Sequence, residues 1–220
     1  IQRKNQFAIQ HKRHPCDGFM KIPLILDTMF TGIIEEIGVI TDIQKEAGNI
    51  HFTIESKLSD ELKIDQSVAH NGCCLTVVAL KPGRHTVTAI NETLQKTNLG
   101  SWELGSKINL ERCMSFNGRL DGHIVQGHVD GLARCVSITD EDGSWRYRFE
   151  YHSDFVTVEK GSVTINGTSL TVVDSADGAF SVCIIPYTYE HTNFHTLVVG
   201  AEVNLEFDII GKYVARLMNR

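Results

Sequence analysis

The stretch SVAHNGCCLTVV, residues 67–78, decides how this chain folds, because it returns as SVTINGTSLTVV at residues 162–173. Ser, Val, Asn, Gly, Leu, Thr, Val and Val recur in the same order. An Asn-Gly pair between apolar runs is the strongest short-range signal of a β-hairpin. The Leu-Thr-Val-Val that follows is typical of a strand. Each copy therefore predicts a tight turn that opens into a strand.

Each of these strands begins with two polar residues. The pair is Cys74 and Thr76 in the first copy, and Ser169 and Thr171 in the second. Residues two apart on a strand point to the same face, whereas the neighbouring Cys73 points to the other face. We therefore expect each polar pair to converge on one ligand.

The repeat extends far beyond these stretches at a constant offset of 95 residues, without any insertion. The matched pairs include Gly32 and Gly127, Thr93 and Thr188, Asn98 and Asn193, Gly105 and Gly200, and the Asn-Leu-Glu runs 109–111 and 204–206. This period is too long for a solenoid repeat and suits a small domain. The sequence therefore predicts a tandem duplication of one fold.

Within each copy, short alternating apolar runs are separated by turn signals such as Ala47-Gly48, Pro82-Gly83 and Asp142-Gly143. This pattern is typical of antiparallel sandwiches or barrels rather than of β-α-β units. Two closed barrels would leave few strand edges exposed. We predict an all-β chain of two tandem barrels, with short helices over 57–63 and 94–99.

The chain changes character after Asp208. Ile210, Tyr213, Val214 and Leu217 are spaced as on one face of a helix, which predicts a C-terminal helix with an apolar stripe. Since a helix of about a dozen residues is marginal alone, the stripe is expected either to pack on its own barrel or to assemble subunits.

Composition narrows the classes of partner. The chain has 220 residues, is 42% hydrophobic and carries a net charge of −6, which argues against a nucleic-acid partner. No apolar run approaches the ~18 residues of a membrane span. The six cysteines show no paired CxxC spacing, so we expect small buried residues in a reducing compartment, the cytoplasm.

Residues 1–28 do not resemble the rest of the chain. They are basic, lack Ser and have no repeat partner, so we expect a non-native or misassigned extension before Met29. The predicted domains are this extension, a first barrel over 29–120, a second over 121–207 and a helix over 208–220.

Four motifs carry a resemblance to a known family: MFTGI at 29–33, NGCCLT at 71–76, GHIVQGHV at 122–129 and GTSLT at 167–171. With these motifs, the chain from Met29 to Arg220 resembles riboflavin synthase of the α-chain type. The resemblance implies two lumazine-binding Greek-key barrels and a homotrimer assembled through the C-terminal helix, with a site between barrels of neighbouring subunits. Lumazine synthase is a further partner in this reading.

The reaction implied by the resemblance is a dismutation. Two 6,7-dimethyl-8-ribityllumazines exchange a four-carbon unit and give riboflavin and 5-amino-6-(ribitylamino)uracil, with no metal or external redox cofactor. A reaction between two identical molecules needs two similar pockets, and a duplicated chain supplies them.

The resemblance also implies the residues of the site. The first pocket takes Phe30, Thr31, Gly32, Ile33, Ile34, Cys74, Leu75, Thr76, Thr88, Ala89, Ile90, Asn91, Glu92 and Thr93. The second takes Gly127, His128, Val129, Ser169, Leu170, Thr171, Ile185, Pro186, Tyr187, Thr188, Tyr189 and Glu190, with Lys160 reaching a neighbouring subunit's ligand. Phe30 is expected to stack on or cover a ligand ring. The candidate catalytic residues are Ser67, Cys74, His128 and Asp208. Tyr187 and Tyr189 depart from the repeat, because the first copy has Glu92 and Leu94.

The chemical roles of these residues leave alternatives open. His128 is the candidate for proton transfer because its free pKa is near neutrality, and the structural alternative is a histidine hydrogen-bonded at a barrel end. His123 is expected to be structural. Activation of the acceptor lumazine requires a nucleophile, and water, Ser67 and Cys74 all qualify; Cys74 as a thiolate would need a lowered pKa. Asp208 is either a group at the reacting centre or a helix cap.

Two other functions compete with this interpretation. A non-catalytic lumazine-binding or flavin-binding protein shares the barrels, but it is expected to lose polar groups in one of them. A flavin-dependent reductase would need a nicotinamide-binding domain, and no glycine-rich dinucleotide fingerprint follows a strand in this chain.

Overall fold

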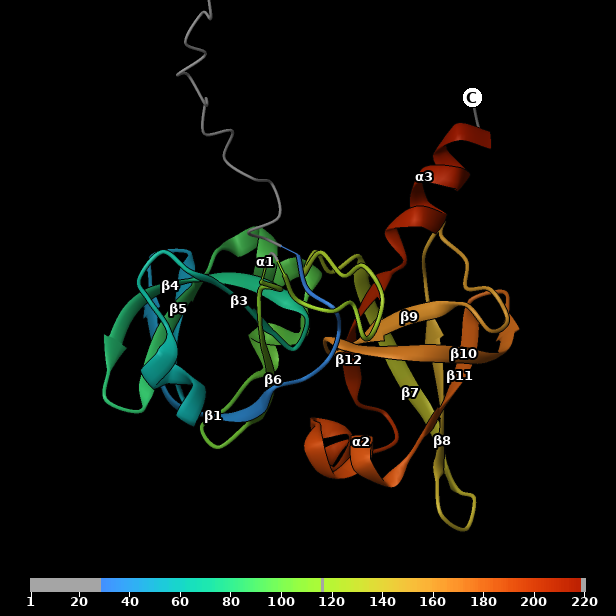
Figure 1. Cartoon of the computed structure of the whole chain (residues 1–220), viewed down its shortest axis with the longest axis horizontal. Coiled ribbons are helices and arrows are strands. Elements are labelled where there is room, and N and C mark those ends of the chain that lie inside the picture. The colour runs from blue at the N-terminus through green and yellow to red at the C-terminus, as the bar shows by residue number, and fades with distance from the viewer. Residues whose placement is uncertain (1–28, 116, 219–220) are drawn as a thin grey trace, which may run out of the picture.

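The computed structural model describes residues 29–115 and 117–218. The chain forms two closed six-stranded antiparallel barrels side by side, and a helix projects beyond the second barrel (Figure 1). The predicted all-β class and tandem barrels are thereby confirmed. The predicted extension over 1–28 lies outside the described residues.

The two barrels have matching elements. The first contains β1 (Glu36–Glu46), β2 (Asn49–Glu55), β3 (Ser67–His70), β4 (Cys73–Lys81), β5 (Arg84–Ala89) and β6 (Lys107–Arg112), closed in the order β1-β2-β5-β4-β3-β6. The second contains β7 (Gly131–Asp140), β8 (Trp145–Tyr151), β9 (Ser162–Ile165), β10 (Thr168–Ala176), β11 (Ala179–Ile184) and β12 (Glu202–Phe207), closed as β10-β11-β8-β7-β12-β9.

Short helices connect the strands. They are η2 (Lys57–Glu61), α1 (Asn91–Lys96) and η3 (Asn98–Ser101) in the first half, and α2 (Pro186–His191) and η4 (Asn193–Thr196) in the second. The predicted C-terminal helix is confirmed as α3 (Ile209–Met218), which has no counterpart among the described residues of the first half. Among the described residues, no helix has the length and apolar character needed to cross a membrane.

The repeated Asn-Gly pairs form the predicted hairpin turns. Asn71 and Gly72 have φ of 46° and 77°, and Asn166 and Gly167 have φ of 45° and 81°. Two consecutive residues with positive φ match the twist of the flanking strands, and Asn followed by Gly tolerates this conformation best. The turns join β3 to β4 and β9 to β10, as the repeat predicted.

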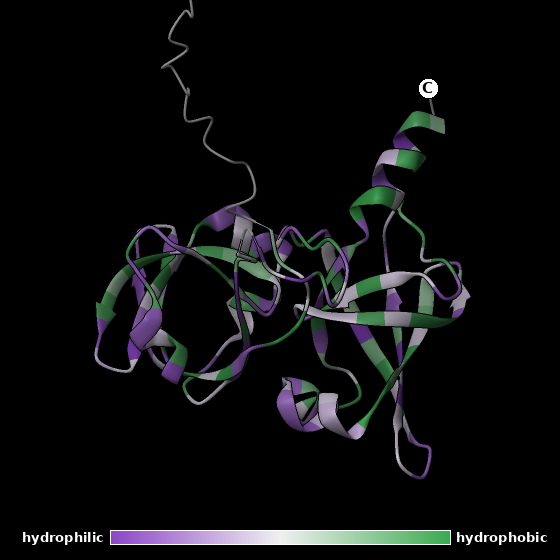
Figure 2. Ribbon diagram, in the orientation of Figure 1, coloured by the Kyte–Doolittle hydropathy of each residue, from purple (hydrophilic) through white to green (hydrophobic). Residues whose placement is uncertain are grey.

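Each barrel encloses its own apolar core (Figure 2). Cys73 belongs to the first core while Cys74 is only half-buried, as strand alternation predicts. The second core is richer in aromatic side chains. Phe149 packs against Phe180 with ring centroids 5.7 Å apart, and Tyr151 packs edge-on against Phe207.

The first core also contains a chain of buried polar groups. His70 and His85, 0% and 1% exposed, are joined through their Nε2 atoms at 2.8 Å. His70 Nδ1 donates to the Val68 carbonyl, so its Nε2 accepts from His85, whose Nδ1 accepts from the Ser59 hydroxyl. The second copy has Ile165 and Phe180 at the positions of the two histidines. Only the neutral imidazoles fit this chain of hydrogen bonds.

This arrangement predicts that acid destabilises the first barrel through its histidines. Burial lowers the pKa of His70 well below its ordinary value and that of His85 to about 4. The unfolded chain therefore binds more protons, and the stability present above pH ~6.5 is lost as the pH falls toward 4. His85 alone accounts for about 3 kcal/mol over this range.

Urea unfolding at pH 7 and pH 4 measures this loss, with the double variant His70→Ile/His85→Phe as the control because it copies the second barrel. The variant is expected to lose about 3 kcal/mol less than the wild-type chain on acidification. An equal loss in both proteins would show that other groups cause it.

Candidate functional site

The two barrels meet where their Asn-Gly turns face each other. A Cβ on Gly72 would lie 2.7 Å from the Gly167 nitrogen, and a Cβ on Gly167 would lie 2.7 Å from the Gly72 nitrogen. No side chain fits at this distance. The repeated glycines are therefore needed for the close approach of the barrels as well as for the turns.

Six buried asparagines surround these glycines in three matched pairs: Asn71 and Asn166, Asn98 and Asn193, and Asn109 and Asn204. Their hydrogen bonds are reciprocal. Asn109 Nδ2 donates to the Asn166 carbonyl at 2.9 Å, and Asn204 Nδ2 donates to the Asn71 carbonyl at 2.9 Å. The backbone of Asn193 donates to Asn109 Oδ1, and that of Asn98 donates to Asn204 Oδ1, each at 2.7 Å. The seam thus has pseudo-two-fold symmetry.

Two segments that precede the barrels cross this seam. Phe30 and Val125 exchange backbone hydrogen bonds of 2.8 and 3.1 Å. Beyond this bridge, the Gly32 carbonyl accepts from the Ser169 amide at 2.8 Å, and the Gly127 carbonyl accepts from the Cys74 amide at 2.8 Å. Each segment is therefore hydrogen-bonded to the strand that follows the Asn-Gly turn of the opposite barrel, which is β10 for Gly32 and β4 for Gly127.

The resemblance assigned Gly32 to Ile34 to the same ligand pocket as Cys74, and this stays a prediction about the bound ligand. The backbone contacts at the seam are a separate matter. The structure pairs Gly32 with Ser169 and brings Gly127 to Cys74, and Val129 packs against the core of the first barrel. The repeat shows which positions are equivalent, but the two-fold relation decides which copy they contact.

Two buried carboxylates hold the crossing segments. Glu111 accepts from the amides of Thr31 and Gly32 and from the Thr31 hydroxyl, at 2.6 to 3.2 Å. Its repeat partner Glu206 accepts from the amides of Gln126 and His128 at 2.7 and 3.0 Å. Burial raises the pKa of both carboxyl groups to about 7, against the effect of these hydrogen bonds.

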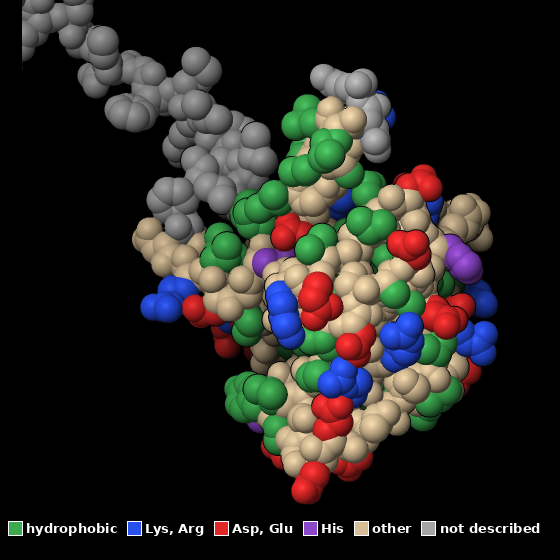
Figure 3. Space-filling view, turned by 90° about the vertical axis from the view of Figure 1, so that its right-hand side faces the viewer, with side chains coloured by type: hydrophobic (Ala, Val, Ile, Leu, Met, Phe, Trp, Pro, Cys, Tyr) green, Lys and Arg blue, Asp and Glu red, His purple; other side chains and the backbone are tan. Residues whose placement is uncertain are grey.

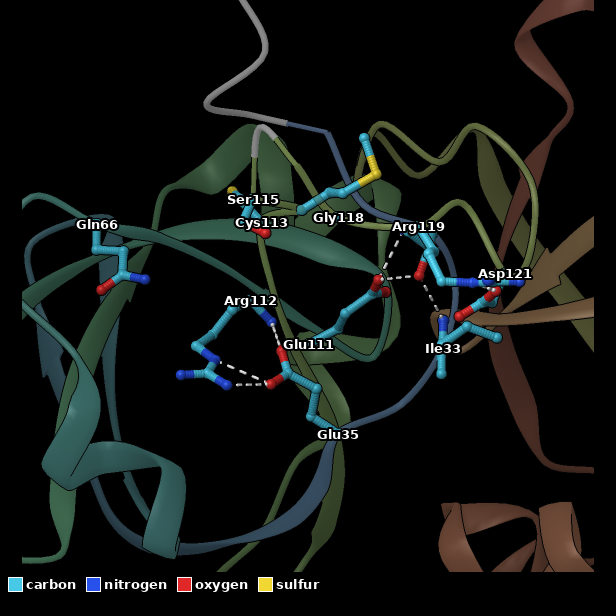
Figure 4. A pocket seen from close by; sticks show the side chains of 12 residues that line it. Ile33, Glu35, Gln66, Glu111, Arg112, Cys113, Ser115, Gly118, Arg119 and Asp121 are labelled. Carbon is cyan, nitrogen blue, oxygen red and sulfur yellow. Dashed lines mark hydrogen bonds and ion pairs between the residues drawn. The ribbon is translucent and has the colours of Figure 1, made fainter.

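A first pocket of about 500 Å³ opens beside Glu111 (Figure 4). It is lined by Thr31, Ile33, Glu35, Gln66, Glu111, Arg112, Cys113, Met114, Ser115, Gly118, Arg119 and Asp121. Arg112 pairs with Glu35 at 2.6 Å, and Arg119 pairs with Asp121 at 3.0 Å. The lining is rich in charged groups of both signs, which suits a polar ligand.

Ser67, Cys74 and Thr76 lie together on adjacent strands, and none of the three lines this pocket, which contains the neighbouring Gln66 instead. Ser67 is opposite Thr76 in the ladder between β3 and β4, and the Cys113 thiol donates to the Ser67 carbonyl at 3.4 Å. Burial raises the pKa of the Cys74 thiol, the nearby Glu206 raises it further, and a hydrogen bond with Ser67 only partly offsets this rise. Cys74 is therefore a neutral thiol, which favours a role in shape and hydrogen bonding over one as a nucleophile.

A second pocket of about 410 Å³ lies between α3 and the segment before β9. It includes Gly161, Phe207 and Asp208, which are the repeat partners of Gln66, Arg112 and Cys113 in the first pocket. Val156, Val158, Val214 and Met218 make this lining more apolar. The two pockets are therefore equivalent in position but different in chemistry.

The second half places a histidine where hydroxyl groups converge. His123 Nδ1 is 2.7 Å from Ser169 Oγ, and its Nε2 is 3.1 Å from Thr164 Oγ1. Burial lowers the pKa of His123, while Asp208 partly opposes this shift. The expected structural role of His123 agrees with these hydrogen bonds. Its electrostatic interaction with Asp208 also places it near a candidate catalytic residue.

Asp208 and His128 have distinct surroundings. Asp208 Oδ1 accepts from the Ile210 amide at 2.9 Å and caps α3, which is the structural alternative considered for it. His128 is fixed by its backbone to Glu206 and exposes its side chain. Asp208 lies in the second half, whereas Ser67 lies in the first, so the candidate catalytic residues are divided between the halves.

The remaining predicted residues lie around the barrel mouths. Residues 88–93 run from the end of β5 into α1, and 185–190 run into α2, with Ile90 and Ile185 about half exposed. Lys160 is exposed. Phe30, expected to cover a ligand ring, is 0% exposed and packs with Ala69 and Val125 at the seam.

The tyrosines that break the repeat have partners of their own. Tyr189 stacks on Trp145 at 3.9 Å, whereas the first copy has Leu94 and Ile50 at these positions, both packed against the core. Tyr187 stacks on His191 at 4.0 Å. The aromatic pair Trp145 and Tyr189 thus occupies the positions that the aliphatic pair Ile50 and Leu94 has in the first copy.

Sequence reasoning missed the roles of Glu111, Glu206 and the asparagines. The signal was present, because Asn-Leu-Glu recurs at 109–111 and 204–206, each time after a β-branched apolar residue, Ile108 or Val203, that is typical of a strand. A charged residue repeated within a buried strand indicates a partner. Among the described residues, no group of three or more His, Cys, Asp or Glu is arranged to hold a metal ion.

The fold and the seam define a class of protein with two tandem ligand-binding barrels, and comparison with known proteins agrees. The lumazine binding domain matches twice, at residues 31–113 and 126–208. The structure of LumP complexed with 6,7-dimethyl-8-(1'-D-ribityl) lumazine superposes with a TM-score of 0.74 at 25% identity, covering 81% of this chain and 98% of LumP. The LumP complex with riboflavin gives a TM-score of 0.75 at 25% identity, covering 80% and 98%.

Curated relatives are more similar in sequence. Riboflavin synthase of Actinobacillus pleuropneumoniae is 43% identical over 193 residues, covering 86% of this chain and 90% of the relative. The enzyme of Bacillus subtilis is 38% identical over 195 residues, covering 87% and 91%. The chain belongs to the riboflavin synthase family of tandem lumazine-binding proteins.

The close approach at the crossing segments predicts that Gly127→Ala is strongly destabilising. Gly127 has φ of 74°, and an added Cβ would lie 2.7 Å from the Cys74 Cβ. Gly83→Ala is the matched control, because Gly83 has φ of 67° with nothing within 4 Å. The control is expected to lose ~1–2 kcal/mol from backbone strain, and Gly127→Ala a further ~1–3 kcal/mol from overpacking.

Urea unfolding measures both losses, and fluorescence titration measures lumazine binding. Gly127→Ala is expected to weaken binding, whereas Gly83→Ala leaves it unchanged. Equal stability losses in the two variants would contradict the close contact.

Proposed function

We propose that the protein is a riboflavin synthase, a transferase that moves a four-carbon unit between two molecules of 6,7-dimethyl-8-ribityllumazine. The products are riboflavin and 5-amino-6-(ribitylamino)uracil. The observation that carries the proposal is that the lumazine binding domain occurs twice in one chain and that both copies retain a polar pair on the same strand. Cys74 and Thr76 serve the first, and Ser169 and Thr171 serve the second. A reaction between two copies of one molecule requires such a pair.

The chemistry asks for little from the protein. The 7-methyl group of the lumazine is acidic because its anion delocalises into the ring, so positioning and a modest base suffice. Holding two reactants together supplies on the order of 7 to 11 kcal/mol at best, and acid–base help adds roughly 10²–10⁴-fold. We assign proton transfer to His128, whose exposed side chain stands at the end of a rigidly held segment.

The two sites favour different roles for the two substrates. In the first, the neutral Cys74 thiol and Ser67 offer hydrogen bonds. In the second, Asp208 and His123 provide groups that accept protons. Water or Ser67 then remains as the nucleophile that activates the acceptor lumazine, and the neutral Cys74 shapes its pocket.

We further propose that the enzyme acts as a homotrimer assembled through α3. The side chains of Ile210, Tyr213, Val214, Leu217 and Met218 are 50 to 79% exposed on this helix, whose outer end projects beyond the barrel (Figure 3). Such an apolar stripe needs a cover. A second copy of α3 supplies one and would bring the first site of one subunit to the second site of its neighbour.

The setting of this activity follows from the same proposal. We place the enzyme in the cytoplasm, where cysteines remain reduced, and no disulfide joins the described cysteines. Lumazine synthase is the proposed further partner, because its product is the substrate.

The competing function is that of a lumazine carrier without catalysis, and the likeness to LumP favours it. Against it stand the polar pairs in both sites and the higher identity, 35 to 43%, to riboflavin synthases.

Turnover separates the two functions. The purified protein supplied with 6,7-dimethyl-8-ribityllumazine alone is expected to form one riboflavin for every two lumazines consumed. Chromatography of both compounds measures this ratio. Tight lumazine binding without conversion would support the carrier, and a requirement for a reduced nicotinamide would refute both functions.

Deleting residues 209–220 is expected to leave both barrels folded, because α3 contributes no residue to either core cluster. The truncated chain should lose assembly, measured by light scattering, and most of its activity at the same protein concentration. Full activity from a monodisperse monomer would contradict a site shared between subunits.

A further inference from the structure

The segment Gln126–His128 connects the two halves through a short series of contacts. The carboxylate of Glu206 in β12 accepts the amides on either side of Gly127. The Gly127 carbonyl in turn accepts the Cys74 amide at 2.8 Å. A charged group in the second barrel thus fixes the backbone of Cys74 in the first.

Glu206 has a cation near it that comes from α3. Lys212 Nζ is 2.8 Å from both carboxylate oxygens of Asp130, and Asp130 Oδ2 also accepts the Phe207 amide. The Lys212 side chain is only 13% exposed, and its ammonium lies 6.0 Å from the centre of the Phe155 ring. The helix is therefore anchored to the barrel by a largely buried charge.

The charged and titratable groups near Glu206 come from three elements. Lys212 lowers the pKa of Glu206, Asp130 raises it, and Cys73 and Cys74 of β4 lie within electrostatic range. Because burial raises that pKa to about 7, Glu206 is divided between its charged and neutral forms near neutral pH. Loss of the nearby cation would shift the balance toward the neutral acid.

The buried carboxylate of the first copy, Glu111, has different neighbours. Glu111 receives an additional hydrogen bond from the Thr31 hydroxyl, where the second copy has Gln126. Arg112 in β6 pairs with Glu35, the repeat partner of Asp130. The cation of the first half belongs to the barrel itself. Only in the second half does it come from the helix whose apolar stripe is exposed.

We propose that Glu206 is a positioning residue for the first lumazine site, holding Gln126–His128 against Cys74. Lys212 holds Asp130, and Asp130 accepts the Phe207 amide next to Glu206, so the docking of α3 controls how firmly this segment is held. This inference rests on the proposed function for its ligand, and it links subunit assembly to the geometry of a site in the opposite barrel.

Three variants of the full-length protein test the proposal. Glu206→Gln removes the charge and one acceptor, Lys212→Met removes the cation but keeps the aliphatic stem, and Arg216→Met removes a charge from an exposed position on the same helix as the control. Hydrogen exchange of peptides covering Gln126–His128 and Cys74 measures the segment directly and needs no ligand. Titration with 6,7-dimethyl-8-ribityllumazine measures both sites by fluorescence.

Glu206→Gln is expected to speed exchange in both peptides about tenfold and to weaken one of the two lumazine sites about tenfold. In the wild-type protein, the affinity of that site should fall as the pH drops through about 7. Lys212→Met should move this fall to higher pH, Arg216→Met should leave it in place, and Glu206→Gln should abolish it.

The proposal is overturned if Glu206→Gln exchanges and binds like the wild type, or if Lys212→Met and Arg216→Met give the same pH midpoint. Failure of the proposed function looks different. Lumazine binding without turnover, or no binding at all, would reject the synthase, while the exchange rates of Gln126–His128 would still decide the role of Glu206.

Discussion

Everything in this structure depends on the contact between two glycines. Gly72 and Gly167 bring two tight turns so close that a single methyl group would separate them. Around this point, the buried asparagines exchange side-chain-to-backbone hydrogen bonds across the seam. A buried amide without a partner is costly, so the network tolerates one relative orientation of the barrels. That orientation in turn places both crossing segments.

The crossing segments bind each half of the chain to a strand of the other half. Gly127 binds the Cys74 amide in β4, and Gly32 binds the Ser169 amide in β10, so each of these strands is contacted by a segment from the other half. The carboxylates that hold these segments share a raised pKa but differ in their support. Glu111 accepts an additional hydrogen bond from the hydroxyl of Thr31, whereas Glu206 interacts electrostatically with Lys212 of α3. The two barrels have matching strands, but the charged and polar groups around their buried carboxylates differ.

The sequence predicted a large part of this arrangement because the repeat is exact in spacing. The hairpins at Asn71-Gly72 and Asn166-Gly167, the tandem barrels and the helix after Asp208 all follow from local patterns that the structure confirms. The exchange across the seam does not, because a repeat identifies equivalent positions without saying which copy each one contacts. Phe30 illustrates the difference: its apolar ring was assigned to a ligand, but the seam buries it completely. Such placements depend on packing between segments distant in the chain, which no local pattern encodes.

The reciprocal contacts at the seam have the geometry of an isologous dimer interface contained in one chain. Asn109 and Asn204 each donate to the backbone of the opposite half, and Phe30 and Val125 exchange backbone hydrogen bonds. A half-length ancestor with a single barrel could have formed this interface with a second copy of itself, each copy lending its leading segment to the other. Fusion of the two copies would then have freed Cys74 and Ser169, or Arg112 and Phe207, to diverge. One polypeptide can specialise its two halves in a way that a symmetric dimer of identical chains cannot.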